Sequence, residues 1–169
     1  MIHVSLLGAS GSVGESCLKV IEKFPQEISL LNCSIHSNII KAKSIIEKFS
    51  PKVLVVTDPT VDKNKLGDRI NNTELRYGFQ HLNDIVCEDR VDVVITAIVG
   101  SIGIRPTISA IKANKKIGIA NKETLVTFGP IIKNLLKSYR ASIVPVDSEH
   151  NALFQLLEGR DRESIKCIT

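Results

Sequence analysis

Runs of apolar, often β-branched residues recur along the chain, and a segment with helical spacing follows most of them. The runs are continuous rather than alternating, which is typical of strands buried on both faces. The strands expected from these runs cover residues 2–7, 28–35, 52–57, 91–98, 116–120 and 141–146. A further strand is expected to begin within residues 164–169.

Between these runs, apolar positions repeat with the period of a helix. The expected helices cover residues 12–23, 39–49, 82–87, 106–113, 124–139 and 151–158. The first two stop before Pro25 and Pro51, since the residue before a proline disfavours the helical conformation. Residues 58–72 are polar and contain Pro59 and Gly67, so we expect them to be irregular or partly helical.

Strands that alternate with helices in this way indicate right-handed βαβ units and a mostly parallel, doubly wound sheet of the α/β class. We assign residues 1–146 to this domain and residues 147–169 to the start of a second, incomplete domain. Because the sequence stops inside an expected strand with no closing helix, we expect it to be a fragment.

Composition excludes several classes of protein. The chain has 169 residues, of which 43% are hydrophobic and 24% charged, so it is not disordered. It lacks an apolar stretch long enough for a membrane span and a secretory signal, which favours the cytoplasm. Its cysteines form no Cys-x-x-Cys pair, and we expect mostly buried, reduced thiols at Cys17, Cys33, Cys87 and Cys167.

The net charge of +4 says little about the binding partner. Basic residues alternate with acidic ones, and aromatic residues make up 4%, so the sequence does not favour nucleic-acid binding. A small phosphorylated ligand is compatible with this balance.

Glycines dominate the junction between the first expected strand and the first helix, residues 8–14, here termed the glycine turn. Gly8 can make the tight turn, Gly11 can let the backbone approach a pyrophosphate, and Gly14 can permit close packing of helix on strand. Free amides at the helix N-terminus would then face the phosphates. A glycine-rich turn without a ligand is the alternative, but the strand–turn–helix context favours a Rossmann-like dinucleotide site.

The end of the second expected strand bears on the choice of dinucleotide. Enzymes that use NAD place an acidic residue there to bind the ribose 2′-hydroxyl. This chain instead has His36, Ser37 and Asn38, which can donate hydrogen bonds to a 2′-phosphate. NADP is therefore favoured over NAD, with an exposed loop histidine as the alternative for His36.

Three later strand ends carry polar or glycine-rich segments, and ligands of an open parallel sheet lie at such ends. Glycines within residues 99–103 would allow close approach to a cofactor. Lys122 lies between Asn121 and Glu123, where its ammonium could form an ion pair or stabilise an oxyanion or a substrate phosphate.

The last of these strand ends is acidic. Asp147 and Glu149 are separated by one residue, so in an extended strand their side chains would leave on the same side. Paired carboxylates suit Mg²⁺ or Mn²⁺. Helix capping by Asp147 or Ser148 is an equal alternative. His150 would then be a third ligand or a residue of the helix start.

Four segments occur in a characteristic order and spacing: Gly8-Ala9-Ser10-Gly11-Ser12-Val13-Gly14, Ala97-Ile98-Val99-Gly100, Ala120-Asn121-Lys122-Glu123-Thr124-Leu125-Val126 and Pro145-Val146-Asp147-Ser148-Glu149-His150-Asn151-Ala152-Leu153-Phe154-Gln155. Together they resemble the 1-deoxy-D-xylulose 5-phosphate reductoisomerase family. The resemblance implies isomerisation of 1-deoxy-D-xylulose 5-phosphate and reduction of the product to 2-C-methyl-D-erythritol 4-phosphate, in non-mevalonate isoprenoid biosynthesis. It implies NADPH and Mg²⁺ or Mn²⁺ as cofactors.

The resemblance also implies roles for individual residues. Those expected to contact NADPH are Ser10, Gly11, Ser12, Val13, His36, Ser37, Asn38, Asn121 and Glu123. Lys122, Ser148 and Glu149 would contact the phosphorylated sugar, with Lys122 and Glu149 catalytic. Asp147 and Glu149 would bind the metal. The resemblance thus favours metal binding over helix capping for these two carboxylates.

Two departures from the family pattern have consequences. Ser37 stands where many members place a basic residue near the 2′-phosphate. Members are also more than twice as long and are homodimers, so this chain is expected to bind NADPH without completing the reaction. Two rival functions are an aspartate-semialdehyde-type NADP dehydrogenase, which needs a cysteine nucleophile, and a non-catalytic NADP-binding module.

Overall fold

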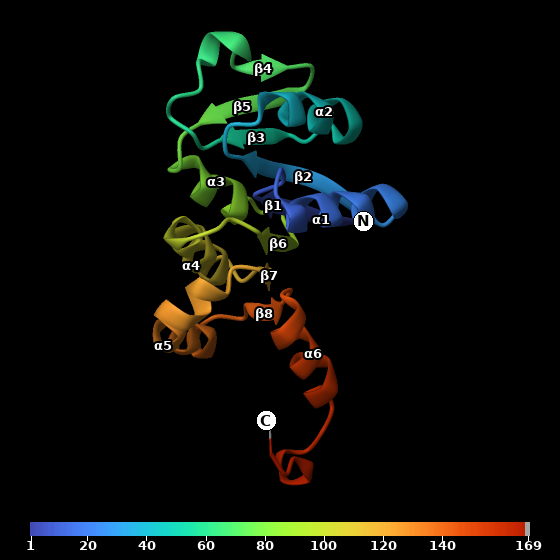
Figure 1. The fold of residues 1–169 in the computed structure, drawn as a ribbon, viewed down its shortest axis with the longest axis vertical. Coiled ribbons are helices and arrows are strands. Elements are labelled where there is room, and N and C mark those ends of the chain that lie inside the picture. The colour runs from blue at the N-terminus through green and yellow to red at the C-terminus, as the bar shows by residue number, and fades with distance from the viewer. Residues whose placement is uncertain (168–169) are drawn as a thin grey trace.

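The computed structural model describes residues 1–167 and arranges them around one sheet (Figure 1). Within this range the strand order is β4-β5-β3-β2-β1-β6-β7-β8, and β4 with β5 is the antiparallel pair. The strands are β1 (Ile2–Leu7), β2 (Ile28–Ile35), β3 (Val53–Val56), β4 (Arg69–Ile70), β5 (Thr73–Tyr77), β6 (Val93–Thr96), β7 (Lys116–Ile119) and β8 (Ser142–Pro145). The predicted α/β class with a mostly parallel, doubly wound sheet is confirmed.

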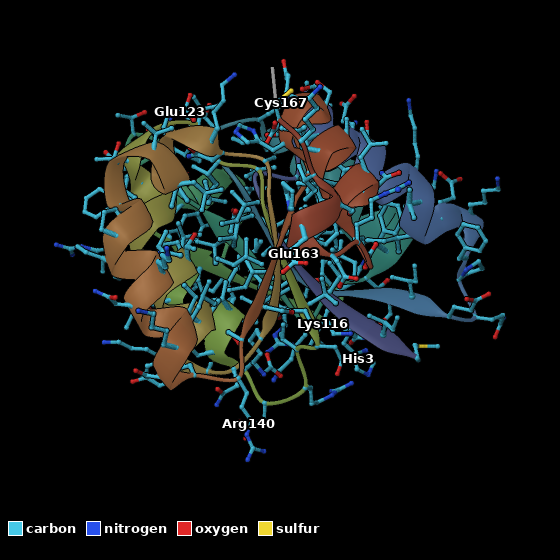
Figure 2. All side chains as sticks on the ribbon, turned by 90° about the horizontal axis from the view of Figure 1, so that it is seen from below. His3, Lys116, Glu123, Arg140, Glu163 and Cys167 are labelled. Atoms are coloured by element: carbon cyan, nitrogen blue, oxygen red, sulfur yellow. The ribbon has the colours of Figure 1, made fainter. Side chains whose placement is uncertain are left out.

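Helices cover both faces of the sheet. They are α1 (Ser12–Lys23), α2 (Ile39–Phe49), α3 (His81–Cys87), α4 (Ile104–Lys112), α5 (Lys122–Ser138) and α6 (Ser148–Leu157). Figure 2 shows α4 and α5 on one side of the sheet and α1 and α6 on the other. Within residues 1–167, none of the helices has both the length and the apolar character needed to cross a membrane.

Each face of the sheet has its own hydrophobic core. Leu6 and Leu7 are consecutive residues of β1, both 0% exposed, and their side chains enter different cores because strand side chains alternate. The core under α1 and α2 includes Leu6, Leu18, Ile21, Ile45 and Leu54. The core under α3, α4 and α5 includes Leu7, Ile85, Ile111, Ile119 and Ile132. Burial on both faces explains why the strands read as continuous apolar runs.

The strand order reverses between β1 and β6, which lie side by side at the centre of the sheet. The chain proceeds from β1 towards β2 on one side and from β6 towards β7 on the other. Helices that follow these two strands therefore separate to opposite faces and leave a crevice at the carboxyl ends of the strands.

Several sequence predictions were wrong. Residues 58–72 are mostly irregular with a 3-10 turn, as expected, but they also contain the unpredicted strand β4, and β5 was not predicted either. The sequence of β5, Thr-Glu-Leu-Arg-Tyr, is not a continuous apolar run, so the strand was missed. The helix expected at 106–113 begins at Ile104, because a 3-10 turn, Ser101–Gly103, leads directly into it.

The expected final strand is also wrong where the structure describes it. Ser164 lies in the 3-10 turn Arg162–Ser164, and residues 165–167 have no regular structure, while 168–169 lie outside the described residues. The cysteines are free thiols, as expected, but Cys87 and Cys167 are exposed, so the prediction of mostly buried cysteines is wrong. Burial raises the pKa of the Cys33 thiol far above its usual range.

The end of the chain is less covered than its beginning. None of the residues of α6 is buried, and Leu153, Phe154 and Leu156 are 39%, 37% and 63% exposed. Figure 1 shows the segment after α6 running away from the sheet beyond β8. The region around α6 thus presents an uncovered apolar surface.

Candidate dinucleotide and carboxylate site

The glycine turn adopts the geometry that its sequence predicted. Gly8 has a φ of +85°, in the left-handed region that favours glycine, and a Cβ there would lie 2.6 Å from the Ala97 carbonyl oxygen. A Cβ at Gly14 would collide with the backbone of Gly8 and Ala9, so α1 packs on the turn without room for a side chain. The turn is held to β2 by Ser34, whose Oγ accepts from the Gly8 N–H at 3.0 Å.

Gly11 is not required by the backbone conformation, but its missing side chain leaves space for a ligand to approach the backbone. Its φ of −85° and ψ of 172° are open to any residue, and a Cβ there would meet only the Gly8 carbonyl oxygen, at 3.6 Å. No side chain among the described residues caps α1, whereas α2, α5 and α6 are capped by side chains. The first amides of α1 are therefore available for an anion, as a dinucleotide pyrophosphate requires.

A cavity of about 320 Å³ joins the glycine turn to the ends of β2 and β3. Its walls are largely apolar. They are formed by Gly8, Ser10, Gly11, Ser34, Ile35, His36, Thr57, Phe79, Ala97, Ile98, Val99 and Ile102. The cavity lies where the crevice between β1 and β6 opens, which is the position of the ligand in this class of sheet.

His36 lines this cavity at the ends of β2 and β3. His36 Nδ1 lies 3.1 Å from Thr57 Oγ1, and its Nε2 lies 3.8 Å from Asp58 Oδ2. Hydrogen bonds from the hydroxyl and N–H of Thr60, at 2.7 and 2.8 Å, hold the pKa of Asp58 below its ordinary value. Ser37 and Asn38 follow at the exposed start of α2, where Asn38 caps the helix by accepting from the Lys41 N–H.

A second cavity, of about 240 Å³, continues the cleft towards β7 and β8. It shares Gly11 and residues 97–99 with the first cavity and adds residues from three strand ends. Those additional residues are Ser12, Val13, Ala120, Asn121, Lys122, Glu123 and Asp147. The cleft at this edge of the sheet thus contains some of the predicted phosphate, cofactor and metal residues, whereas Ser37, Asn38, Ser148 and Glu149 line neither cavity. Figure 2 shows Glu123 at this edge and His3, Lys116 and Arg140 at the opposite one.

Asn121 holds the loop of residues 98–103, which borders both cavities. Its Nδ2 donates to the carbonyl oxygens of Ile98 and Gly100, at 2.6 and 2.7 Å, and its Oδ1 accepts from the Thr124 N–H. The side chain is 5% exposed. The amide predicted to contact the cofactor is therefore committed to the backbone of this loop.

Val99 of this loop lines both cavities and Ile102 lines the first one. Gly100 and Gly103 line neither cavity. That these glycines allow close approach of a cofactor stays a prediction. Gly100 adopts a φ of +80°, and its carbonyl oxygen accepts from Asn121. A Cβ at Gly103 would make only ordinary van der Waals contacts with Asn121 and Thr124, at 3.5 and 4.0 Å.

The two carboxylates after β8 are arranged by a helix start. Asp147 caps α6, accepting at Oδ1 from the His150 N–H at 3.0 Å, and the His150 Nδ1 lies 2.6 Å from the same oxygen. The argument that both carboxylates leave an extended strand on one side is wrong, because α6 already begins at Ser148. Capping, one of the two alternatives, is present.

Capping leaves the other oxygen of Asp147 free. Oδ2 is buried and has no hydrogen-bond partner within the described structure. The pKa of Asp147 lies below its usual value, first because of the His150 N–H and also through the charge of Lys122. The pKa of Glu149 is lowered by its own N–H, by the Ser148 hydroxyl at 2.8 Å and by Lys122. Both groups are thus ionised at neutral pH.

This donor set is suited to a hard divalent cation but is not complete. Asp147 has a free, buried oxygen and Glu149 is an exposed carboxylate, so both can offer oxygen ligands. Within residues 1–167, no cluster of three or more acidic, histidine or cysteine side chains is placed to hold a metal. None of the cysteines in this range lines either cavity, which leaves the semialdehyde-dehydrogenase alternative without its nucleophile.

Sequence reasoning missed four residues of the site: Ser34, Thr57, Asp58 and Phe79. Thr57 and Asp58 directly follow β3, so the rule that ligands lie beyond strand ends could have found them. Ser34 was hidden because it lies inside β2 and acts on the turn from the side. Phe79 follows β5, a strand that the sequence pattern did not reveal.

The sheet order, the glycine turn and the cleft at the carboxyl edge define a Rossmann-like α/β domain, the class that binds dinucleotides at this edge. A sequence model described as 1-deoxy-D-xylulose 5-phosphate reductoisomerase matches residues 4–129, so the chain belongs to that family. The relative from Leptospira borgpetersenii, of the same name, is 56% identical over 98% of this chain and 42% of its own length.

Solved structures of reductoisomerases resemble the fold closely. The enzyme from Zymomonas mobilis in complex with NADPH has a TM-score of 0.85 and 30% identity, over 91% of this chain and 41% of its own. A reductoisomerase in complex with NADPH, fosmidomycin and magnesium has a TM-score of 0.84 and 33% identity, over 92% and 38%. The chain spans about two fifths of the length of the curated relatives it matches.

Proposed function

We propose that this chain is the NADPH-binding part of a 1-deoxy-D-xylulose 5-phosphate reductoisomerase and contributes the first metal-binding carboxylates. The observation that carries the proposal is the continuous cleft from the glycine turn, past Asn121 and Lys122, to Asp147. Membership of the family and the NADPH named for the Zymomonas mobilis structure support the choice of cofactor.

The glycine turn would hold the pyrophosphate. Ser10, Gly11, Ser12 and Val13 line the cleft, and the free amides at the start of α1 supply the donors. The open space beside Gly11, where a side chain would project, fits a ligand that approaches the backbone closely. Bound NADPH would supply the hydride for the reduction.

Polar donors at the end of β2 would hold the ribose phosphate. His36, Ser37 and Asn38 contribute an imidazole, a hydroxyl and an amide, and all three side chains are exposed. An acidic residue, which would repel the 2′-phosphate, is absent from these three positions. We therefore expect tighter binding of NADPH than of NADH, and Ser37→Asp should weaken NADPH selectively.

Asp147 and Glu149 would hold Mg²⁺ or Mn²⁺, and Ser148 would contact the sugar beside them. The buried, unpartnered Oδ2 of Asp147 is the feature of this chain that fits a cation. A metal there would act as a Lewis acid on the substrate oxygens. The family's magnesium complexes support this assignment.

Lys122 would act on the substrate from the start of α5. Its side chain is exposed in the second cavity, and its charge lowers the pKa of both Asp147 and Glu149. An ammonium in this place can bind the sugar or stabilise negative charge that develops on its oxygen. Glu123, next to it, would lie against the cofactor.

Other parts of the proposal concern the longer protein. We propose that the dinucleotide domain ends near residue 146 and that residues 147–169 begin the catalytic domain. Isoprenoid biosynthesis, a homodimer and a cytoplasmic location remain predictions for the longer protein.

A chimera tests the proposed activity. Residues 1–169 replace the matching segment of the Leptospira borgpetersenii relative, and consumption of NADPH is followed with 1-deoxy-D-xylulose 5-phosphate and Mn²⁺. We expect turnover that depends on both the sugar and the metal. A chimera that folds and binds NADPH but does not turn over would contradict the enzyme proposal and favour a non-catalytic NADP-binding module.

A further inference from the structure

An aromatic ring lines the first cavity, and the proposed function gives it no role. The ring belongs to Phe79, which lies in the segment between β5 and α3. Phe79 is 38% exposed, whereas Ile35, on the wall of the same cavity, is 1% exposed. Phe79 therefore presents apolar surface that a ligand in the cavity can cover.

A tight turn fixes the place of Phe79. Gly78 has a φ of +106°, in the region that favours glycine, and its N–H donates to the Val56 carbonyl oxygen at 2.8 Å. On the other side of Phe79, Gln80 reaches back across the turn, where its Nε2 donates to the Tyr77 carbonyl oxygen at 3.1 Å. Because the backbone is held on both sides of the ring, little further ordering is needed when a ligand binds against it.

Further apolar side chains line the cavity from the segment after β6. They are Ile98, Val99 and Ile102, of which Val99 is 84% and Ile102 42% exposed. Phe79 lies shortly before α3 and Ile102 shortly before α4, and these two helices contact each other over the same core. The cavity thus has apolar, partly exposed side chains from two neighbouring segments on one face of the sheet.

A flat, uncharged group fits this part of the cavity better than an anion. With the pyrophosphate at the amides of α1 and the ribose at the end of β2, the base of the dinucleotide has to lie in the rest of the cavity, towards Thr57 and Phe79. His36 is the one ionisable side chain among the described residues that line this cavity. A nucleotide base offers a π-face that an aromatic side chain can cover.

We propose that Phe79 is the residue on which the adenine of the dinucleotide stacks. The inference deepens the proposed function and rests on it. Adenine is common to NADPH and NADH, so Phe79 raises the affinity for both and leaves the preference between them unchanged. The same contact holds ADP, which carries the base, but not inorganic pyrophosphate, which lacks it.

The test compares Phe79→Ala with wild type by fluorescence titration with NADPH and NADH, and by competition with ADP and with inorganic pyrophosphate. We expect the dissociation constants of NADPH, NADH and ADP to rise about tenfold in the variant. The constant for pyrophosphate should stay within about twofold, because the glycine turn is intact. Phe79→Tyr keeps the ring and should bind like wild type, whereas Phe79→Leu is apolar without a ring and should remain weakened.

Phe154→Ala is the matched control. Phe154 is 37% exposed on α6 and lines neither cavity, so the same substitution there should leave all four constants unchanged. Circular dichroism verifies that each variant is folded. Wild-type affinity for ADP in folded Phe79→Ala or Phe79→Leu, or an equal loss for pyrophosphate, would overturn the inference while leaving the dinucleotide site intact. Failure of the wild type to bind NADPH, NADH and ADP would overturn the proposed function and this inference with it.

Discussion

The glycine turn after β1 and the acidic turn after β8, residues 147–150, lie at the same edge of the sheet but in different surroundings. Leu6 and Leu7 before the glycine turn are 0% exposed, and α1 closes over the turn. After the acidic turn, α6 has no buried residue and exposes Leu156 by 63%. The first turn is built by the packing of this chain, whereas at the second Glu149 and the apolar side chains of α6 are exposed.

This difference suggests that the glycine turn can bind a dinucleotide within this chain, whereas the acidic turn needs the longer protein for catalysis. A dinucleotide needs the shape of the glycine turn and free amides, and both are in place. A metal-dependent reaction needs more ligands than Asp147 and Glu149 supply, and relatives are more than twice the length that this chain covers. We therefore expect changes at the first turn to act within this chain and changes at the second to act on activity in the longer protein.

The largest expected effect is that of Glu149→Gln in the chimera. Turnover should fall by about two to three orders of magnitude, as for loss of a group that stabilises transition-state charge, while NADPH affinity stays within about twofold because the glycine turn is a separate site. Steady-state kinetics at saturating Mn²⁺ and NADPH titration measure the two. Glu158→Gln, at the far end of α6, is the control and should leave both unchanged. Near-normal turnover of Glu149→Gln would exclude the metal assignment.

Two leucine substitutions test whether the region before the glycine turn is more tightly packed than α6 in this chain. Leu6→Ala should lower the free energy of unfolding by about 2–5 kcal/mol, since it opens a cavity in the core. Leu156→Ala makes the same chemical change at an exposed position and should cost no more than about 0.5 kcal/mol. Urea denaturation followed by circular dichroism gives both values. Equal costs would show that α6 is covered in solution.

Asn121 connects the two regions, and Asn121→Asp tests that connection. Aspartate keeps the acceptor for the Thr124 N–H but loses both donors to Ile98 and Gly100. We expect a loss of about 1–3 kcal/mol in unfolding free energy, typical of buried groups left unsatisfied, together with roughly tenfold weaker NADPH binding, equivalent to about 1.4 kcal/mol. Unchanged NADPH affinity in a destabilised variant would mean that the loop does not position the cofactor.

The smallest expected effect is on acid stability. Burial raises the pKa of Glu88, but hydrogen bonds from Lys52 at 2.6 Å and Asn32 at 3.0 Å outweigh it, so the net shift is downward. A depressed pKa stabilises the fold above the carboxyl's unfolded value, and this contribution is lost as the pH falls through the folded value. Glu88→Gln should therefore remove about 1 kcal/mol at neutral pH and less at pH 3. If Glu88→Gln destabilised the fold more at pH 3 than at neutral pH, the pKa of Glu88 would be raised by folding and not lowered.

The same contrast explains what could be predicted from the sequence. Strands buried on both faces leave continuous apolar runs, so β1, β2 and the sheet class were predictable. The mixed pattern of β5, at the edge of the parallel region, concealed it and with it the place of Phe79.

The site divides in a similar way. Gly8 and Gly14 were predictable because their roles follow from backbone geometry alone. The commitment of Asn121 to a loop was not, since Ile98 and Gly100 lie more than 20 residues away and meet it only in the folded chain. Asp147 shows a further limit: one carboxylate both caps α6 and leaves an oxygen free, so the two alternatives for it were compatible.

Titration of the 169-residue chain with NADPH tests the central claim, that this chain alone builds the dinucleotide site. We predict saturable binding by wild type, loss of binding in Gly11→Val, and unchanged binding in Glu149→Gln. Valine fits the extended backbone at residue 11, so Gly11→Val should remain folded while its methyl groups fill the space beside the amides of α1. Absence of binding by the wild type, or full binding by a folded Gly11→Val, would contradict the account.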